Sequence, residues 1–167
     1  VAFFVFPAQV GLLPIVRNRD LQFEKIFRIL RHKIYGIRPP ENILLDLDST
    51  LLKTYGHQEG EGFNYHYQSH GFHPLLCFDG LTGDLLKAEL RKGTKYCSSD
   101  AHLFLEPLLN EFLEQYPDVM ISLRGDSGFA APEIYDLAET HGCSYAIRLK
   151  MNSNLRSSAS YVEADLD

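Results

Sequence analysis

Hydrophobic residues occur in short runs between Gly, Pro and polar residues, which is the pattern of an α/β domain. Buried strands are predicted over three such runs, at 43–48, 119–123 and 144–149. Two further runs, 74–79 and 84–90, flank a four-residue segment with Gly at both ends, which predicts an antiparallel hairpin.

Helical periodicity appears before and between these runs. A helix is predicted over 21–32 with Asp20 as its cap, a second over 101–115 with Asp100 as its cap, and a third from Pro132 to about Thr140. The apolar side of the first helix consists of Leu21, Ile26, Phe27, Ile29 and Leu30. Helical crossovers connect parallel strands, so the expected fold is an α/β mixed sheet, an antiparallel hairpin plus parallel strands, with flanking helices.

Residues 53–73 have little periodicity and are rich in Gly, His, Tyr and Gln, which predicts a long loop with a short strand around 64–68. The histidines of this His-rich loop are His57, His66, His70 and His73. Their spacing matches no compact zinc finger, which favours a polar loop near DNA or a partly buried histidine. The aromatic residues Tyr65, Tyr67 and Phe72 are suited to stacking on bases, and packing against the hairpin explains them equally well.

Charge is unevenly distributed along the chain. The 167 residues carry a net charge of −6, but residues 17–38 carry +5 and the remainder carries −11. A basic arm beside an acidic body suits contact with phosphates by one part and metal binding by another, although a solvated helix face has the same pattern. The sequence thus divides into an N-terminal arm with a basic helix at 1–40, a core at 41–151 and a polar tail at 152–167.

The composition excludes several classes of protein. With 45% hydrophobic residues, the chain has enough apolar mass for a core, which excludes a disordered or collagen-like chain. Three cysteines without a close pair argue against a disulfide framework and suit the cytoplasm. The apolar start, residues 1–6, is too short to span a bilayer, and no membrane partner is expected.

Two aspartates stand at the carboxyl ends of predicted buried strands, Asp48 and Asp126, and each is followed by small or hydroxyl residues. Carboxylates gathered at one edge of a sheet repel each other unless a hard divalent cation lies between them. Such ions catalyse displacement at phosphorus. From spacing alone, this interpretation and a simple role as loop caps have equal standing.

Four ordered motifs carry a more specific signal. They are Leu-Asp-Leu-Asp-Ser-Thr at 45–50, Gly-His-Gln-Glu-Gly at 56–60, Leu-Leu-Cys-Phe-Asp-Gly at 75–80 and Arg-Gly-Asp-Ser-Gly-Phe at 124–129. At these motifs, within a likeness that runs over about 12–155, the chain resembles bacterial insertion-sequence DDE transposases with the group 1 pattern. The resemblance implies an RNase H-like fold and cut-and-paste DNA transposition by metal-dependent cleavage and strand transfer.

The resemblance also implies roles for single residues. Asp48 and Asp126 correspond to the first two catalytic carboxylates, which bind Mg²⁺ or Mn²⁺, and the partners are transposon ends and target DNA. The third family carboxylate, a Glu on a later helix, has no counterpart, since Glu163 is too near the last strand and has no helical pattern around it. The chain is therefore expected to be an incomplete fragment that does not transpose alone. The alternative is a DNA-binding regulatory or inactive remnant that occupies transposon ends or partners another transposase chain.

The first motif also resembles the start of haloacid-dehalogenase-like phosphatases. In that interpretation Asp46 is the nucleophile, Asp48 the acid/base and Mg²⁺ the clamp. That family expects a lysine and a hydroxyl motif in a repeating strand–helix array, and this chain has a Gly/His/Tyr-rich loop and a hairpin instead. The transposase interpretation is therefore favoured.

Three basic residues near the carboxylates are candidates for DNA binding. Arg148 and Lys150 share one face of the predicted last strand, and Arg124 precedes Asp126 by two positions. Contact with the DNA backbone would give them a salt-dependent contribution to affinity. Solvent-facing side chains without a ligand are the alternative.

Overall fold

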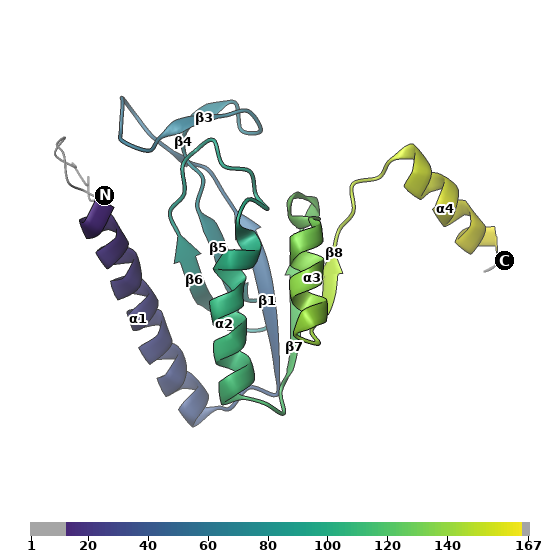
Figure 1. The fold of residues 1–167 in the computed structure, drawn as a ribbon, viewed down its shortest axis with the longest axis horizontal. Helices are drawn as coiled ribbons and strands as arrows, with labels where there is room; N and C mark the ends of the chain where they lie inside the picture. The colour runs from purple at the N-terminus through teal and green to yellow at the C-terminus, as the bar shows by residue number, and fades with distance from the viewer. Residues whose placement is uncertain (1–12, 165–167) are drawn as a thin grey trace.

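A computed structural model describes residues 13–164. A five-stranded mixed sheet forms the centre of the molecule (Figure 1). Its strand order is β6-β5-β1-β7-β8. The strands are β1 (Asn42–Ser49), β5 (Leu75–Asp79), β6 (Leu85–Glu89), β7 (Met120–Gly125) and β8 (Ser144–Ile147). β1 pairs antiparallel with β5 and parallel with β7, and β8 continues the parallel side.

Helices and a second, smaller sheet surround this centre. The helices are α1 (Leu13–Ile37), α2 (Ala101–Gln115), α3 (Pro132–Thr140) and α4 (Ser153–Ala164), with a short 3₁₀ turn, η1 (Ser127–Phe129). The smaller sheet has the order β2-β4-β3 and consists of β2 (Leu52–Lys53), β3 (Gly62–Asn64) and β4 (Ser69–Phe72). In Figure 1 it lies beyond the carboxyl end of β1, while α2 and α3 cover one face of the large sheet. No helix within residues 13–164 is long and apolar enough to cross a membrane.

The core follows from the two-residue period of the strands. In β1, Ile43, Leu45 and Leu47 are buried, whereas the alternate residues Leu44 and Asp46 are only partly covered. The buried face meets the apolar stripes of α2 and α3 in a single cluster. Its members on α2 and α3 are Ala101, Phe104, Leu105, Leu108, Leu109, Phe112, Ile134, Leu137 and Ala138. This rigid layer fixes where the ends of β1 and β7 lie.

The predicted mixed α/β sheet is confirmed, and its strand order and directions are those of an RNase H-like fold. The hairpin at 74–79 and 84–90 corresponds to β5 and β6, with the turn between them closed by a bond from the Gly83 amide to the Asp79 carbonyl (2.7 Å). The predicted helices at 101–115 and from Pro132 to Thr140 are also confirmed.

The first helix differs from its prediction. It runs from Leu13 to Ile37, so Asp20 lies inside the helix and is not its cap. The expected apolar side is not a core face, because Ile26, Ile29 and Leu30 are about half exposed. Instead α1 joins the body through its other side. There Arg31 pairs with Glu111 of α2, and the Tyr35 hydroxyl donates to Asp79 (3.1 Å).

The segment 53–73 is more ordered than predicted. It contributes strands to the small sheet on both sides of residues 65–68, which form the turn between β3 and β4. Of the predicted strand around 64–68, only Asn64, the last residue of β3, lies in a strand. The Asn64 side chain makes this turn, because its Oδ1 accepts bonds from the amides of His66 (3.0 Å) and Tyr67 (3.3 Å).

The starts of α2 and α4 also differ from the predictions. Asp100 stands at the start of α2, but its backbone has a positive φ (57°) and its carboxylate bonds the Lys95 ammonium (2.6 Å) rather than a helix amide. The predicted polar tail contains α4, which begins where the Asn152 side chain accepts a bond from the Leu155 amide (2.8 Å). The expectation that Glu163 lies outside any helix is therefore wrong.

Candidate active site

Parallel pairing of β1 with β7 brings Asp48 and Asp126 to neighbouring positions. The register joins Leu47 to Gly125 at the carboxyl ends of the two strands, and each aspartate is the next residue. Both side chains are exposed. The two carboxylates therefore lie at one edge of the sheet, as the sequence predicted for strand ends.

Each aspartate is held by a backbone amide that follows it. Asp48 Oδ1 accepts a bond from the Ser49 amide (2.7 Å), and Asp126 Oδ1 accepts one from the Gly128 amide (2.7 Å). The second bond caps η1, which turns the chain sharply after β7. Within residues 13–164, no protein group donates a hydrogen bond to the Oδ2 atom of either aspartate. One oxygen of each carboxylate thus remains available for a ligand.

Three further residues line this edge. The Tyr67 hydroxyl donates to the Ser49 carbonyl (3.2 Å), and the Ser49 hydroxyl donates to Cys97 Sγ (3.1 Å). Burial raises the pKa of Tyr67, and the neighbouring Cys97, Asp48 and Asp126 raise it further. Tyr67 therefore stays protonated beside them. The sequence singled out Tyr67 only as an aromatic residue, and it contained no signal for Cys97.

Arg124 lies on the same face of the sheet, but it is engaged by Asp46. Its Nε and Nη2 donate to the two oxygens of Asp46 (2.9 and 2.6 Å), a bidentate pair across β1 and β7. The hydrogen bond to Asp46, followed by the charge of that carboxylate, raises the pKa of Arg124. The arrangement leaves Asp46 as the partner of an arginine, with both of its oxygens occupied. Contact between Arg124 and DNA stays a prediction.

Arg148 and Lys150 lie beyond the last strand. Because β8 ends at Ile147, the prediction that they share one face of that strand is wrong. The Arg148 amide donates to the Gly125 carbonyl (3.2 Å), which holds this segment next to the turn that carries Asp126. Both side chains are exposed. Their role in binding DNA remains a prediction.

A third carboxylate does not join the pair within the part of the chain that the structure describes. No group of three or more His, Cys, Asp or Glu residues there could hold a metal ion. Glu163 lies in α4, which stands apart from the large sheet in Figure 1, and its side chain lies outside the described residues. In the His-rich loop, His57 and His70 lie near Glu61 (3.8 and 3.1 Å).

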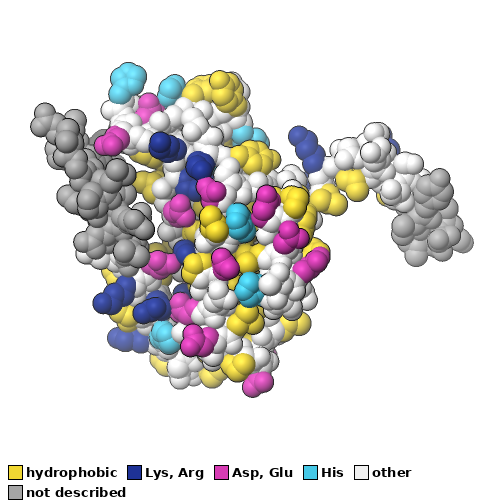
Figure 2. All heavy atoms as spheres, in the orientation of Figure 1, with side chains coloured by type: hydrophobic (Ala, Val, Ile, Leu, Met, Phe, Trp, Pro, Cys, Tyr) yellow, Lys and Arg dark blue, Asp and Glu magenta, His cyan; other side chains and the backbone are white. Residues whose placement is uncertain are grey.

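Figure 2 shows the charge on the outer surface of α2 and α3. Some basic side chains gather over the end of α1 that lies far from the small sheet, and others lie near the small sheet and at the start of the segment leading to α4. Histidines lie over the small sheet and also over the helices, and acidic side chains are spread over the whole face shown.

A mixed sheet of this order, with aspartates at the carboxyl ends of β1 and β7, places the protein in the RNase H-like class. The chain belongs to the family described as transposase DDE domain group 1, whose model matches residues 14–167. This confirms the family to which the four sequence motifs pointed. Proteins of this family generally use divalent metal ions.

Solved structures show likeness at low identity. The catalytic domain of the Mos1 mariner transposase has a TM-score of 0.47 and 11% identity, covering 96% of this chain and 76% of that chain. The piggyBac transposase in its synaptic complex with hairpin DNA has a TM-score of 0.44 and 16% identity, covering 69% and 24%. The catalytic core of BIV integrase has a TM-score of 0.37 and 15% identity, covering 75% and 66%. The chain thus matches about a quarter of the piggyBac transposase chain, and no curated protein matches it.

Proposed function

We propose that this chain carries part of the catalytic domain of a DNA transposase, which cleaves and joins the ends of an insertion sequence. The observation that supports this proposal best is the placement of Asp48 and Asp126 at adjacent strand ends in a chain of the DDE family. Each carboxylate keeps one oxygen free of protein donors among the described residues. The arrangement is suited to chemistry at a phosphodiester, for which positioning and charge stabilisation are the main requirements.

The residues present fit a hard divalent cation. Carboxylate oxygens are the ligands that Mg²⁺ and Mn²⁺ prefer, and two exposed aspartates with free Oδ2 atoms at one sheet edge supply them. We infer that Asp48 and Asp126 hold Mg²⁺ or Mn²⁺, which when bound would stabilise negative charge on the phosphate oxygens. The protein's own contribution is to orient the two carboxylates through the Ser49 and Gly128 amides.

We further propose that the substrate is DNA, both transposon ends and target DNA. Arg148 and Lys150 are exposed cations next to the turn that carries Asp126, where they could neutralise phosphates. Arg124 is half exposed but already paired with Asp46, so it would reach DNA only by sharing its guanidinium. We place the protein in the cytoplasm, because all three cysteines are free thiols.

An alternative function is a DNA-binding regulator that occupies transposon ends without cutting them, alone or with another transposase chain. The observation in its favour is that only two carboxylates meet at the site within residues 13–164. This function requires affinity for DNA without strand cleavage. The two candidates therefore differ in strand cleavage, and they share the affinity for DNA that the gel-shift experiment below measures.

The metal site is tested by titrating the chain with Mn²⁺ and following the free ion by electron paramagnetic resonance. Asp48→Asn and Asp126→Asn should each weaken binding by more than the roughly 10–100-fold typical of outer-shell partners, because each removes a ligand charge. Asp46→Asn is the matched control, since it changes the same type of residue on the same strand face. Unchanged affinity in both site variants, or an equal loss in the control, would contradict the proposed site.

Contact with DNA is tested by gel-shift measurements on transposon-end duplexes at several salt concentrations. Arg148→Gln and Lys150→Gln should each weaken binding, and each should reduce the slope of log affinity against log salt by about 1. Lys53→Gln in the small sheet is an exposed control and should change the slope less. If the slope of log affinity against log salt is the same in Arg148→Gln and Lys150→Gln as in the Lys53→Gln control, phosphate contacts by Arg148 and Lys150 are ruled out.

A further inference from the structure

The loop of residues 92–100, which joins β6 to α2, lies against both turns of the candidate site. Cys97 Sγ accepts a bond from the Ser49 hydroxyl (3.1 Å), directly after Asp48. On the other side, a methyl group added at Gly128 would lie 3.0 Å from both Cβ and Sγ of Cys97, so the Cys97 side chain contacts the turn after Asp126. One side chain of this loop, that of Cys97, therefore contacts both aspartate turns.

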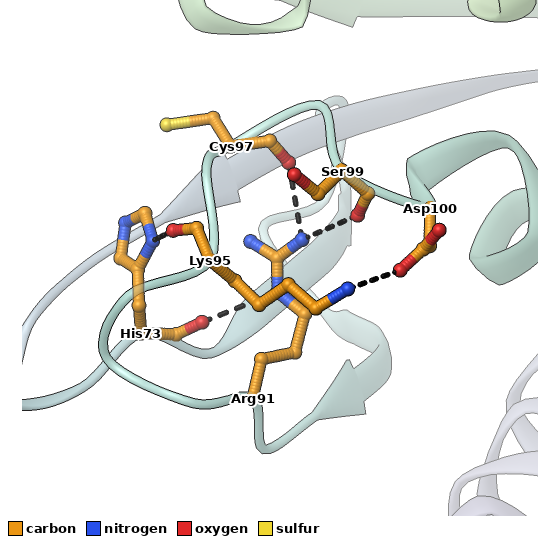
Figure 3. Close-up of polar contacts among 6 residues, drawn as sticks. All are labelled: His73, Arg91, Lys95, Cys97, Ser99 and Asp100. Atoms are coloured by element: carbon orange, nitrogen blue, oxygen red, sulfur yellow. Dashed lines mark hydrogen bonds and ion pairs between the residues drawn. The ribbon is translucent and has the colours of Figure 1, made fainter. Parts of the chain in front are cut away.

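The loop has little regular structure of its own, and a buried arginine holds it. Arg91 is 6% exposed. Its Nη1 donates to the carbonyls of Cys97 (3.2 Å) and Ser99 (2.8 Å), while its Nε donates to the carbonyl of His73 (3.2 Å). Figure 3 shows the guanidinium surrounded by the loop, with the Cys97 and Ser99 carbonyls turned toward it. Arg91 thus fixes the backbone of Cys97 itself.

Neighbouring contacts tighten the same loop. His73 Nδ1 forms a hydrogen bond with the Lys95 carbonyl (2.7 Å), and the Lys95 ammonium bonds Asp100 at the loop's far end (2.6 Å). Figure 3 shows these bonds on either side of Arg91. The His73 ring also contacts Tyr67, at 5.8 Å between centroids. The network therefore reaches Tyr67, whose hydroxyl donates to the Ser49 carbonyl beside Asp48 (3.2 Å).

Burying the positive charge of Arg91 costs free energy, which a purely structural contact would not require. Burial lowers its pKa, and no carboxylate forms an ion pair with it within residues 13–164. Burying a charge without a charged partner is unfavourable unless its hydrogen bonds compensate. Carbonyl groups from two separate segments accept bonds from Nε and Nη1, which a planar guanidinium presents in a fixed fork, while Nη2 is buried with no hydrogen-bond partner among the described residues.

We propose that Arg91 is a positioning residue for the transposase site. By fixing Cys97 between the Ser49 and Gly128 turns, it sets the separation and orientation of Asp48 and Asp126. This inference rests on the proposed function for its consequence in metal binding. The predicted effect of Arg91 on how rigidly the two turns are held can be measured without any metal.

The test compares Arg91→Lys with Arg31→Lys in the 167-residue chain. Arg31 is the matched control because it is equally buried, at 7% exposed, but pairs with Glu111 between α1 and α2. Two readouts are taken at a temperature where circular dichroism shows both variants folded. They are Mn²⁺ affinity and, by nuclear magnetic resonance, hydrogen exchange of the Ser49 and Gly128 amides that bond the aspartates.

Arg91→Lys should weaken Mn²⁺ binding about tenfold or more, in line with outer-shell partners of metal sites, and should accelerate exchange of both amides about tenfold or more. Arg31→Lys should change neither readout. Exchange that is unchanged in Arg91→Lys, or accelerated equally in Arg31→Lys, overturns the positioning role. If the unaltered chain does not bind Mn²⁺, the proposed function fails while the exchange rates still decide the role of Arg91.

A second variant keeps the inference testable if Arg91→Lys does not fold. Cys97→Ala leaves Arg91 and its carbonyl bonds in place but removes the thiol that touches Ser49 and Gly128. The proposal expects the same direction of change in both readouts. Normal exchange at Ser49 and Gly128 in this variant would show that the loop does not position the aspartate turns.

Discussion

A Gly93→Ala variant is expected to lose about 3 kcal/mol or more of its free energy of unfolding, near the upper range for single substitutions. Gly93 lies where the loop of residues 92–100 crosses the small sheet. A Cβ atom there would lie 2.0 Å from the Gly71 carbonyl oxygen and 2.4 Å from the Gly62 carbonyl oxygen. Both obstacles are strand backbone, which cannot move without separating β3 from β4.

The variant is measured by urea denaturation, followed by circular dichroism. The matched control is Gly36→Ala near the end of α1, where nothing lies within 4 Å of the added methyl group. That change should be neutral or stabilising by up to about 1 kcal/mol, because alanine favours a helix over glycine. A Gly93→Ala protein as stable as the control would show that the loop does not pass so close to the small sheet.

Phe129→Ala is expected to cost about 3–5 kcal/mol of unfolding free energy, the usual range for deleting a buried aromatic side chain. Phe129 is 1% exposed and ends η1, the turn that begins at Asp126. Its amide donates to the Asp126 carbonyl (3.1 Å), and its ring and Cβ lie against Gly125. The side chain therefore anchors the turn that carries the second aspartate to the core.

Phe112→Ala is the control for this change, and urea denaturation measures both. Phe112 is fully buried in α2, next to Tyr35 and Tyr116, so its loss should cost a similar free energy. The difference should appear in Mn²⁺ affinity under conditions where both variants are folded. Phe129→Ala should weaken it and Phe112→Ala should not. Equal affinities in both variants would mean that Phe129 stabilises the core without orienting Asp126.

The large sheet was predictable because local patterns of hydrophobic residues and turn residues mark its strands in the sequence. In β1, buried Ile43, Leu45 and Leu47 alternate with less buried residues, and the hairpin has Gly at both ends of its turn. The approximate ends of β1 and β7 were predictable for the same reason, which is why Asp48 and Asp126 could be placed at one edge. The family model matches residues 14–167, a range that includes both motifs.

Other elements were missed because tertiary contacts or short polar signals determine them. The small sheet has strands of two to four residues, too short for a hydrophobic period to show. In α1 the pattern of apolar residues predicted a core face, but Arg31 and Tyr35 make the contact with the body. The start of α4 depends on the single cap Asn152 before a serine-rich stretch.

The contacts around the candidate site were the least predictable part. Cys97 reaches Ser49 across 48 positions, and the pairing of Arg124 with Asp46 spans 78. A carbonyl group carries no sequence signature, so the bonds of Arg91 to Cys97 and Ser99 could not be read from residue types. The sequence predicted Asp48 and Asp126 as the site carboxylates, and the structure added the contacts that hold them in place.

The register between β1 and β7 has a thermodynamic consequence for the proposed metal site. Asp48 and Asp126 are far apart in the chain and become neighbours only when the two strands pair, so an unfolded chain presents no such pair of ligands. An ion that binds there would bind the native state alone and would stabilise it by about 2.7 kcal/mol at one hundred times its dissociation constant. The melting temperature of the unaltered protein would then rise with Mn²⁺ concentration, which makes occupancy of the site visible without any DNA.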